Sequence, residues 1–300
     1  MFFSPEGFTE YELIDAGGFE KLERFGTYIL RRPEPQAVWK KTLDERDWQK
    51  LAHVVFVPKT SSSGNWNKLK TMPDRWEIKY RLNGDEDKSD SDKTLRFRLA
   101  LTGFKHVGIF PEQAVNWKYI YNALRNPELK NPSFLNLFAY TGGASLAARA
   151  AGADVTHLDS IKQVVTWAND NMTLSGLDNI RWMVDDAMKF VKREIRRGKT
   201  YSGIILDPPA YGHGPNGESW KLEDHILELV NDVAQLLNPE RHFLILNTYS
   251  LGFSSLIIQN LLSDVKKKDD KLSSGELFLP SKHGAKLPLG VFGILSNLLG

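Results

Sequence analysis

One short segment has residue types that point directly to chemistry: Asp207-Pro208-Pro209-Ala210-Tyr211. Two consecutive prolines permit neither a helix nor a continuing strand ladder, so they hold the backbone extended after the apolar run that ends at Leu206. A rigid Pro208 carbonyl beside the Asp207 carboxylate suits the binding of a ring or exocyclic nitrogen, and Tyr211 could stack on a planar base. The alternative is a plain turn that ends a strand.

Three further acidic residues follow short apolar runs. Asp159, with Ser160 next to it, lies where an acidic residue accepts the two hydroxyls of a ribose in α/β proteins. Asp185 or Asp186 could accept the amino group of an adenine, and we favour Asp186 because it directly precedes the helix expected from Ala187. Each carboxylate could instead cap a helix. Acids at successive strand ends favour a ligand site, because ligands of open α/β sheets bind along that edge.

A glycine turn precedes these acids, in the run Phe138-Ala139-Tyr140-Thr141-Gly142-Gly143. Glycines let a ligand approach the backbone, and the amides at a helix start offer hydrogen-bond donors. The turn lacks the GxGxxG pattern of dinucleotide sites, because Ala144 and Ser145 break the spacing. This departure and the Asp-Pro-Pro turn argue against the competing hypothesis of a nicotinamide-dependent oxidoreductase.

The elements that would position these residues alternate between strand and helix from residue 133 onward. We expect strands at 133–138, 154–159, 180–184, 201–206 and 243–247, and helices from 144 and at 161–174, 187–197 and 222–237. Such alternation predicts an α/β fold with a mostly parallel sheet covered by helices on both faces. A further helix around 254–262 and apolar segments at 276–279 and 291–295 fit a closing antiparallel hairpin.

The N-terminal part has a different pattern, with short alternating or apolar runs at 27–30, 53–57, 76–82 and 94–101. These runs predict a β-rich domain over residues 1–104, with a role in substrate recognition, before a second domain over 105–300. Between Lys59 and Arg81 lie six basic residues with Trp66 and Trp76 interleaved. This stretch could hold a phosphate backbone while a ring stacks on a base, or its tryptophans could pack inward. Residues 84–93 are acidic and polar and predict a loop.

Composition removes several classes of function. The formal net charge of +2 does not indicate a strongly basic nucleic-acid binder, so any such binding requires local patches. The absence of cysteine excludes disulfides, thiolate metal sites and thiol-based catalysis. The histidines are scattered, so we expect no bound metal. Without a secretion signal or a long apolar run, we expect a cytoplasmic protein without membrane association.

Taken together, these motifs resemble the class I S-adenosylmethionine (AdoMet)-dependent methyltransferases. The resemblance is carried by Asn136-Leu137-Phe138, Tyr140-Thr141-Gly142-Gly143, Asp159, Asp186 and Asp207-Pro208-Pro209. Within that group the chain is similar to the bacterial 23S rRNA methyltransferases that modify cytosine C5 or guanine N7, over residues 105–295. The resemblance implies a Rossmann-like sheet of seven strands. It also implies AdoMet as cofactor, with binding residues Phe110, Gln113, Phe138, Ala139, Tyr140, Thr141, Gly142, Gly143, Asp159, Ser160, Asp185, Asp186, Ala187 and Asp207.

The stretch before the first strand of the second domain also looks like that family. In the family, a glutamine in this segment lies near the methionine end of AdoMet, which implies this role for Gln113. Here Pro111-Glu112-Gln113 replaces the family's usual acidic-Gln-Arg run, and the first 100 residues do not look like the RNA-binding domain of several members.

The missing thiol narrows the reaction. Carbon-5 of a pyrimidine must be activated by covalent attack, which related enzymes perform with a cysteine after the fifth strand, where this chain reads Asn247-Thr248-Tyr249-Ser250. We therefore expect methylation of a planar nitrogen, in an RNA and first of all in rRNA. Asp207 and the Pro208 carbonyl would position the acceptor, and Tyr211 or Tyr249 would stack on it. The alternatives are O-methylation with His213 or His225 as base, a protein or small-molecule acceptor, and a non-catalytic RNA-binding or assembly factor.

Overall fold

The computed structural model describes residues 1–60, 63–82, 93–249 and 252–298. These fall into two compact units. Unit 1 comprises Met1–Phe3, Val115–Leu277 and Gly290–Gly300, and unit 2 comprises Ser4–Ala114 and Phe278–Leu289. The expected domains, 1–104 and 105–300, stay a prediction, and the acidic segment 84–93 lies outside the described residues apart from Lys93. Nowhere in the described ranges is a helix long and apolar enough to cross a membrane.

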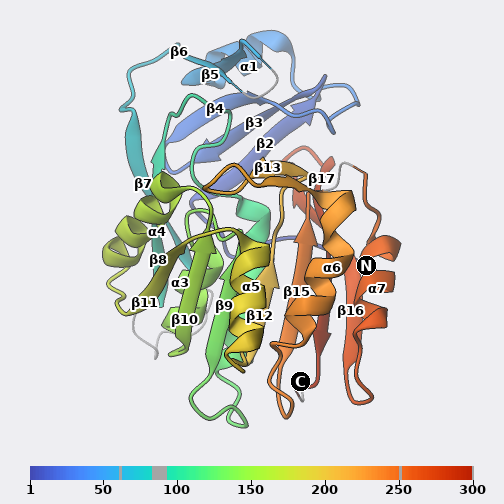
Figure 1. Cartoon of the computed structure of the whole chain (residues 1–300). Coiled ribbons are helices and arrows are strands. Elements are labelled where there is room, and N and C mark those ends of the chain that lie inside the picture. The colour runs from blue at the N-terminus through green and yellow to red at the C-terminus, as the bar shows by residue number, and fades with distance from the viewer. Residues whose placement is uncertain (61–62, 83–92, 250–251, 299–300) are drawn as a thin grey trace. The chain divides into compact units, whose positions relative to one another are not determined.

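Unit 1 is built on a sheet that has eight strands in the described residues, in the order β1-β16-β17-β15-β12-β9-β10-β11 (Figure 1). Their bounds are β1 Phe2–Phe3, β9 Ser133–Leu137, β10 Asp154–Asp159, β11 Ile180–Val184, β12 Gly203–Leu206, β15 Phe243–Thr248, β16 Lys271–Pro280 and β17 Lys286–Ser296. β9 to β12 and β15 pair in parallel, whereas β17 is antiparallel to β15. This confirms the mostly parallel sheet with antiparallel C-terminal strands. The short edge strand β1 adds to the seven expected strands.

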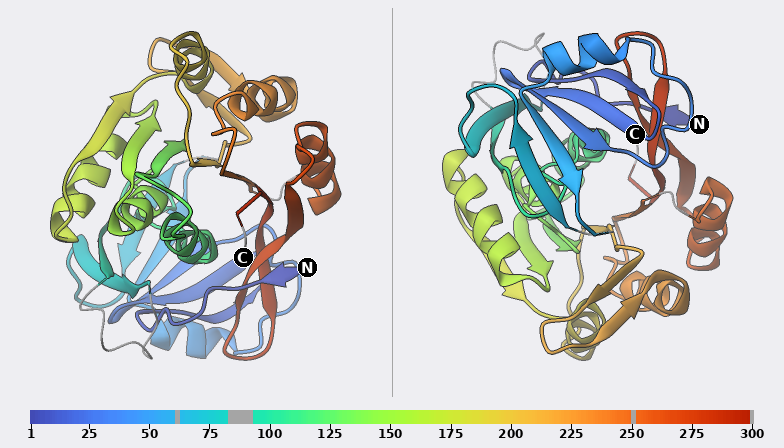
Figure 2. Two further views of the ribbon diagram at one scale, coloured as in Figure 1. Left: turned by 90° about the horizontal axis from the view of Figure 1, so that it is seen from below. Right: turned by 90° about the horizontal axis from the view of Figure 1, so that it is seen from above.

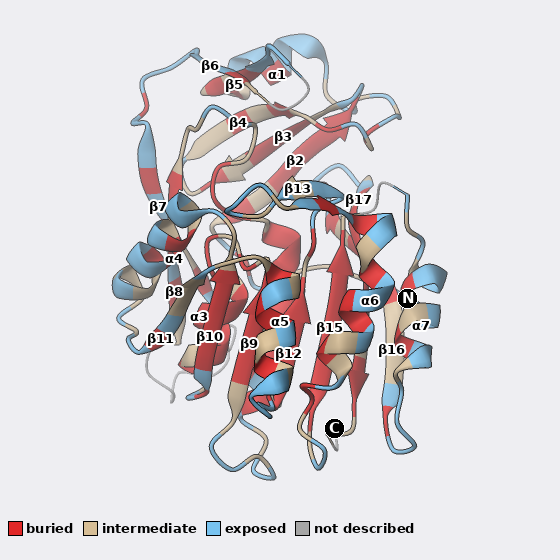
Figure 3. Ribbon diagram, viewed as in Figure 1, coloured by how far each residue is buried: buried red, intermediate tan, exposed pale blue. Residues whose placement is uncertain are grey.

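Helices cover both faces of this sheet (Figure 2). One face carries α5 Ala187–Arg196, α6 Leu222–Ala234 and α7 Ser255–Asp264, and the other carries α2 Ala114–Leu124, α3 Gly143–Ala150 and α4 Lys162–Leu174. Leu135, Leu137 and Leu244 belong to the core shared with α5, α6 and α7, while Phe134 and Phe243 meet on the opposite face. Strands buried on both faces need continuous apolar runs, as their sequences have. Figure 3 shows that α5 and α6 leave only their outer stripes exposed.

Unit 2 is β-rich, as predicted. A five-stranded sheet runs in the order β2-β3-β4-β5-β6, with a separate two-stranded ribbon of β7 and β8. The bounds are β2 Tyr11–Gly17, β3 Glu20–Phe25, β4 Tyr28–Pro33, β5 Val54–Pro58, β6 Gly64–Lys68, β7 Arg75–Arg81 and β8 Thr94–Ala100, with helix α1 Glu45–Leu51 and the 3-10 turn η1 Pro111–Gln113.

The tryptophans of the basic segment are engaged within unit 2. Trp76 is 8% exposed, and its indole Nε1 donates to the Phe25 carbonyl at 3.2 Å. Trp66 donates to the Thr102 carbonyl at 2.7 Å and packs edge-on against Phe56. The interpretation in which the Trp76 ring stacks on a base is therefore wrong, because that ring is part of the core.

Asp15 organises the turn that leads into α1. Its Oδ2 accepts from the backbone N–H groups of Thr42 at 3.0 Å and Leu43 at 2.9 Å, and from the Trp48 indole at 2.9 Å. Asp15→Asn would turn one oxygen into an N–H group amid N–H donors. We expect this change to lower the free energy of unfolding by about 2–3 kcal/mol in urea titrations. Asp44→Asn, at the exposed N-cap of α1, should change it by less than about 0.5 kcal/mol. Equal losses for the two variants would contradict this role.

Candidate functional site

The order in which the chain adds strands to the sheet of unit 1 reverses between β9 and β12. From β9 the chain adds β10 and β11 on one side, and β12 and β15 on the other. At such a switch point the loops at the carboxyl ends of the two central strands part and leave a crevice for a ligand. Residues 138–143 follow β9, Asp159 ends β10, Asp185 follows β11 and Asp207 follows β12. The predicted residues of unit 1 therefore belong to one edge of one sheet.

The turn after β9 is held in an unusual backbone conformation. Phe138 and Tyr140 have φ values of 57° and 49°, and Gly142 has a φ of 92°. A left-handed conformation costs a residue with a side chain about 1 kcal/mol or more, and such strain gathers where a backbone has to bind something. At Gly143 an added Cβ would lie 2.5 Å from the Trp117 ring, so this position requires glycine. The turn thus brings backbone amides to the sheet edge at the start of α3.

Three buried polar side chains, linked by hydrogen bonds, support this turn. The Asn136 amide donates to the Ser145 hydroxyl at 2.9 Å, and that hydroxyl lies 3.0 Å from His157 Nδ1. Burial lowers the pKa of His157 to about 3, so the imidazole is neutral at physiological pH. Sequence reasoning placed His157 only among the scattered histidines. Ser145 of α3 and Asn136 of β9 lie next to it in the folded protein. The sequence of β10 alone does not show that these residues are close.

Asp159 is oriented by backbone donors. Its Oδ2 accepts from the Tyr140 N–H at 2.9 Å and its Oδ1 from the Ile161 N–H at 3.0 Å. Desolvation nevertheless raises the pKa of Asp159 above its ordinary value. The Ser160 N–H also bonds to this carboxylate, and since a carboxylate has about four acceptor sites, acceptor capacity remains for a ligand hydroxyl. This arrangement suits the two neighbouring hydroxyls of a ribose.

The two acids after β11 are used within the protein. Asp186 is the N-cap of α5, where its Oδ1 accepts from the Lys189 N–H at 2.9 Å. Asp185 accepts from the Asp186 N–H at 2.8 Å and pairs with Arg193. The helix-capping alternative is therefore confirmed for Asp186. A role of either acid, or of Ala187, in holding adenine stays a prediction.

Asp207 lies at the end of β12, half-buried, beside Asn247 of β15. The Asn247 amide Nδ2 donates to Asp207 Oδ1 at 2.7 Å. Desolvation raises the pKa of Asp207 to about 6, although this hydrogen bond acts to lower it. Asn247 is 2% exposed, and among the described residues neither its Oδ1 nor the neighbouring Thr248 hydroxyl has a hydrogen-bond partner. In the sequence, Asn247 served only to mark the segment in which related enzymes have a cysteine. Ser250 of that segment lies outside the described residues.

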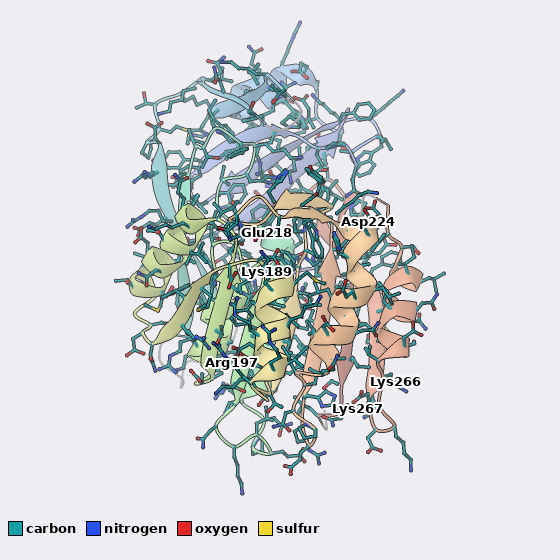
Figure 4. All side chains as sticks on the ribbon, in the orientation of Figure 1. Lys189, Arg197, Glu218, Asp224, Lys266 and Lys267 are labelled. Carbon is teal, nitrogen blue, oxygen red and sulfur yellow. The ribbon has the colours of Figure 1, made fainter. Side chains whose placement is uncertain are left out.

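The hairpin after the two prolines consists of β13 Tyr211–His213 and β14 Ser219–Lys221. Its Trp220 indole donates to the Pro209 carbonyl at 2.7 Å and packs 5.1 Å from the Phe138 ring, measured between centroids. Glu218 forms an ion pair with Lys189 of α5 at 2.5 Å (Figure 4). The hairpin thus contacts both the turn after β9 and helix α5. Trp220, which sequence reasoning missed, makes two of these contacts.

The remaining predicted residues are placed as follows. Tyr211 is 61% exposed, and its hydroxyl lies 3.3 Å from His213 Nε2. His225 packs against the Trp220 ring. Phe110 and Gln113 belong to unit 2, before and within η1, and their role at AdoMet stays a prediction. The described residues include no cluster of three or more His, Asp or Glu that could hold a metal ion.

The hydrogen bond from Asn247 leads to a prediction about the pKa of Asp207. Because a donated hydrogen bond favours the charged carboxylate, Asn247→Leu should raise the pKa of Asp207 further above about 6. Carbon-13 NMR titration of the Asp207 carboxyl measures this change. Thr248→Val removes a neighbouring buried hydroxyl that does not touch Asp207, and it should leave the pKa at about 6. A pKa that is unchanged in Asn247→Leu would show that the contact does not tune Asp207.

The electrostatics of this edge fit a cationic ligand. In the described part of the chain, no lysine, arginine or histidine side chain forms an ion pair with Asp159 or Asp207. Two half-buried carboxylates without a cation suit AdoMet, which carries a positively charged sulfonium and a ribose diol. Asp159 and the amides of residues 139–143 would hold the nucleoside part, and Asp207 would lie on the side of the reacting group.

Comparison with known proteins agrees with this reading. A family model described as S-adenosylmethionine-dependent methyltransferase matches residues 81–269. A crystal structure of a SAM-dependent methyltransferase from Agrobacterium tumefaciens is 34% identical, with a TM-score of 0.90 over 99% of this chain and 94% of that one. A putative SAM-dependent methyltransferase from Streptococcus mutans is 19% identical, with a TM-score of 0.71 over 97% and 76% of the two chains, and shows the same fold.

Curated relatives are much longer than this chain. The ribosomal RNA large subunit methyltransferase K/L of Shewanella frigidimarina is 30% identical over 156 residues, which are 51% of this chain and 21% of that protein. The protein of the same name from Shewanella baltica is 28% identical over 252 residues, 78% of this chain and 33% of that one. The chain therefore spans a third or less of the length of these two relatives. By its family model and its fold, the chain belongs to the S-adenosylmethionine-dependent methyltransferases, with AdoMet as its cofactor.

Proposed function

We propose that the protein transfers a methyl group from AdoMet to a nitrogen of a planar base in RNA, with rRNA as the first candidate. The observation that carries the proposal is the Asp207-Pro208-Pro209 turn at the switch point, with its carboxylate held by Asn247. The names of the curated relatives, ribosomal RNA large subunit methyltransferases, support an RNA substrate.

The residues of the turn have separate tasks in this proposal. AdoMet, when bound, supplies an electrophilic methyl group on its sulfonium. Asn247 occupies Asp207 Oδ1, which leaves Oδ2 to accept the N–H of the acceptor base. With a pKa of about 6, Asp207 is ionised at neutral pH and can take the proton that the nitrogen releases. Trp220 fixes the Pro209 carbonyl, so the acceptor meets a rigid edge.

The absence of cysteine favours a nitrogen over a carbon as the acceptor atom. Methylation at carbon-5 of a pyrimidine requires a covalent adduct with a nucleophile, and the chain has no cysteine to form it. A ring or exocyclic nitrogen has a lone pair of its own and requires alignment, removal of a proton and exclusion of water. These are tasks that Asp207 and the turn can perform.

Transfer of a tritiated methyl group from AdoMet tests the proposal. The purified protein is incubated with total RNA, total protein and small-molecule extracts from a strain that lacks it. We expect incorporation into RNA alone. Incorporation into protein or small molecules, with none into RNA, would overturn the proposed substrate.

A further inference from the structure

Helix α4 contacts the turn after β9 through two buried residues. Ala168 and Asn171 are three positions apart, so they lie on the same face of the helix, and both are 0% exposed. A Cβ added to Gly142 would lie 3.2 Å from the Ala168 Cβ, so helix and turn are closely packed there. The Asn171 amide Nδ2 donates to the Thr141 carbonyl at 3.0 Å. The helix therefore meets two consecutive residues of the turn, one by packing and one by a hydrogen bond.

The peptide group between Thr141 and Gly142 is held at both ends. Its carbonyl accepts from Asn171, and its N–H donates to the Ala139 carbonyl at 3.1 Å. Gly142 has a φ of 92°, and glycine tolerates φ values of either sign, so this peptide group could rotate if its carbonyl were released. The hydrogen bond from Asn171 thus fixes the direction in which the peptide group points.

Neither helix formation nor burial favours an asparagine at position 171. Asparagine ranks below leucine in helix propensity, and an amide that is buried costs free energy unless it forms hydrogen bonds. The turn, in contrast, requires such a contact. Tyr140 and Gly142 both have left-handed backbone conformations, which persist only where the surrounding structure determines them. The identity of Asn171 is therefore explained by what it does for the turn.

We propose that Asn171 is a positioning residue for AdoMet, which keeps the turn after β9 in the conformation that binds the cofactor. The side chain is fully buried, so it acts through the Thr141–Gly142 peptide group. A rotated peptide group would present its carbonyl where the bound state requires an N–H group. A protein that is competent for only part of the time binds its ligand with an affinity lowered by that fraction. This inference concerns the cofactor, so it does not depend on the identity of the acceptor.

Binding kinetics distinguish a positioning residue from one that contacts the ligand. Stopped-flow mixing with AdoMet is followed by tryptophan fluorescence, because Trp117 and Trp220 pack against residues of the turn. We expect Asn171→Ala to bind AdoMet about tenfold more weakly, the effect of one lost hydrogen bond. The loss should appear in the association rate constant, with the dissociation rate constant within about twofold, because the bound ligand itself holds the turn. Asp159→Ala removes a direct contact and should instead speed dissociation.

Two control variants separate positioning from a general loss of stability. Asn169→Ala replaces an exposed asparagine of the same helix, and Val233→Ala leaves a small cavity in the core under α6. Both should bind AdoMet at the rates of the unaltered protein, even where the thermal midpoint of Val233→Ala falls. Asn171→Ser, whose hydroxyl can bond to the helix backbone instead, is a second variant in which we expect the same slow association.

Three outcomes would overturn the proposal: unchanged association in both Asn171 variants, a loss confined to the dissociation rate, or equally slow association in Val233→Ala. Unchanged affinity in Asn171→Ala together with Asp159→Ala would also overturn it, because AdoMet would then not bind at this turn. The assay contains no acceptor. Its failure would therefore leave the proposed methylation of RNA untouched, and a failure to methylate RNA would leave the role of Asn171 untouched.

Discussion

Asp207→Asn will lower kcat for methyl transfer by about 10³-fold while AdoMet affinity changes by only a few-fold. The substitution keeps the shape of the side chain and the acceptor for Asn247, but it removes the group that takes the proton from the nitrogen. General-base catalysis contributes about 10²–10⁴-fold in rate, and alignment of the acceptor adds to it. Single-turnover transfer and calorimetric titration with AdoMet measure the two quantities separately.

The same substitution will stabilise the folded protein above pH 6. Burial raises the pKa of Asp207 from 3.8 to about 6, so ionisation lowers the stability progressively as the pH rises from about 3.8 to about 6, and the full cost applies above that range. Two pH units correspond to about 3 kcal/mol, and the partial exposure of the side chain reduces this to about 1–2 kcal/mol. We expect Asp207→Asn to raise the free energy of unfolding by that amount at pH 8 and by almost nothing at pH 4.

Activity and stability therefore change in opposite directions at this position. Asp154→Asn serves as the control, because Asp154 is an exposed residue at the other end of β10. It should change neither activity nor stability. An Asp207→Asn variant with full activity would remove Asp207 from the mechanism.

Asp159→Ala will weaken AdoMet binding by about 100-fold or more. Its carboxylate fixes the Tyr140 N–H and the Ile161 N–H, and in the bound state it would also accept the ribose hydroxyls. Each charge-assisted hydrogen bond contributes about 1.5–3 kcal/mol, so two lost contacts account for this factor. Isothermal titration with AdoMet measures the affinity.

Asp154→Ala, on the same strand, should bind AdoMet as the unaltered protein does. For Asp159→Ala, a thermal midpoint within a few degrees of the unaltered protein shows that the turn after β9 still folds. An affinity within threefold of the unaltered protein would contradict the role of Asp159 in binding.

Much of unit 1 could be predicted from sequence because its pattern is local. The apolar runs of β10 and β11 end at acidic or polar residues, and their observed bounds are the predicted ones. Asn247 illustrates what could not be predicted. Its partner Asp207 is 40 residues away, and a polar residue at the end of an apolar strand carries no signal of the hydrogen bond that it makes.

Unit 2 was harder to predict because it buries charged residues. β3 reads Glu-Lys-Leu-Glu-Arg-Phe, which lacks an apolar alternation. Glu23 is nevertheless fully buried, since Arg32 of β4 bonds to it at 2.6 Å, and Lys21 pairs with Glu34 at 3.2 Å. Charge pairing between neighbouring strands replaced apolar burial there, and such pairs become visible only once the strand register is known.

The position of the transferred methyl group tests the central claim most directly. RNA from a strain without this protein is methylated in vitro with deuterated AdoMet, digested to nucleosides and fragmented in a mass spectrometer. The proposed mechanism predicts a deuterated methyl group on a base nitrogen, present with the unaltered protein and absent with Asp207→Asn. A methyl group on carbon-5 of a pyrimidine, or on a ribose oxygen, would contradict it.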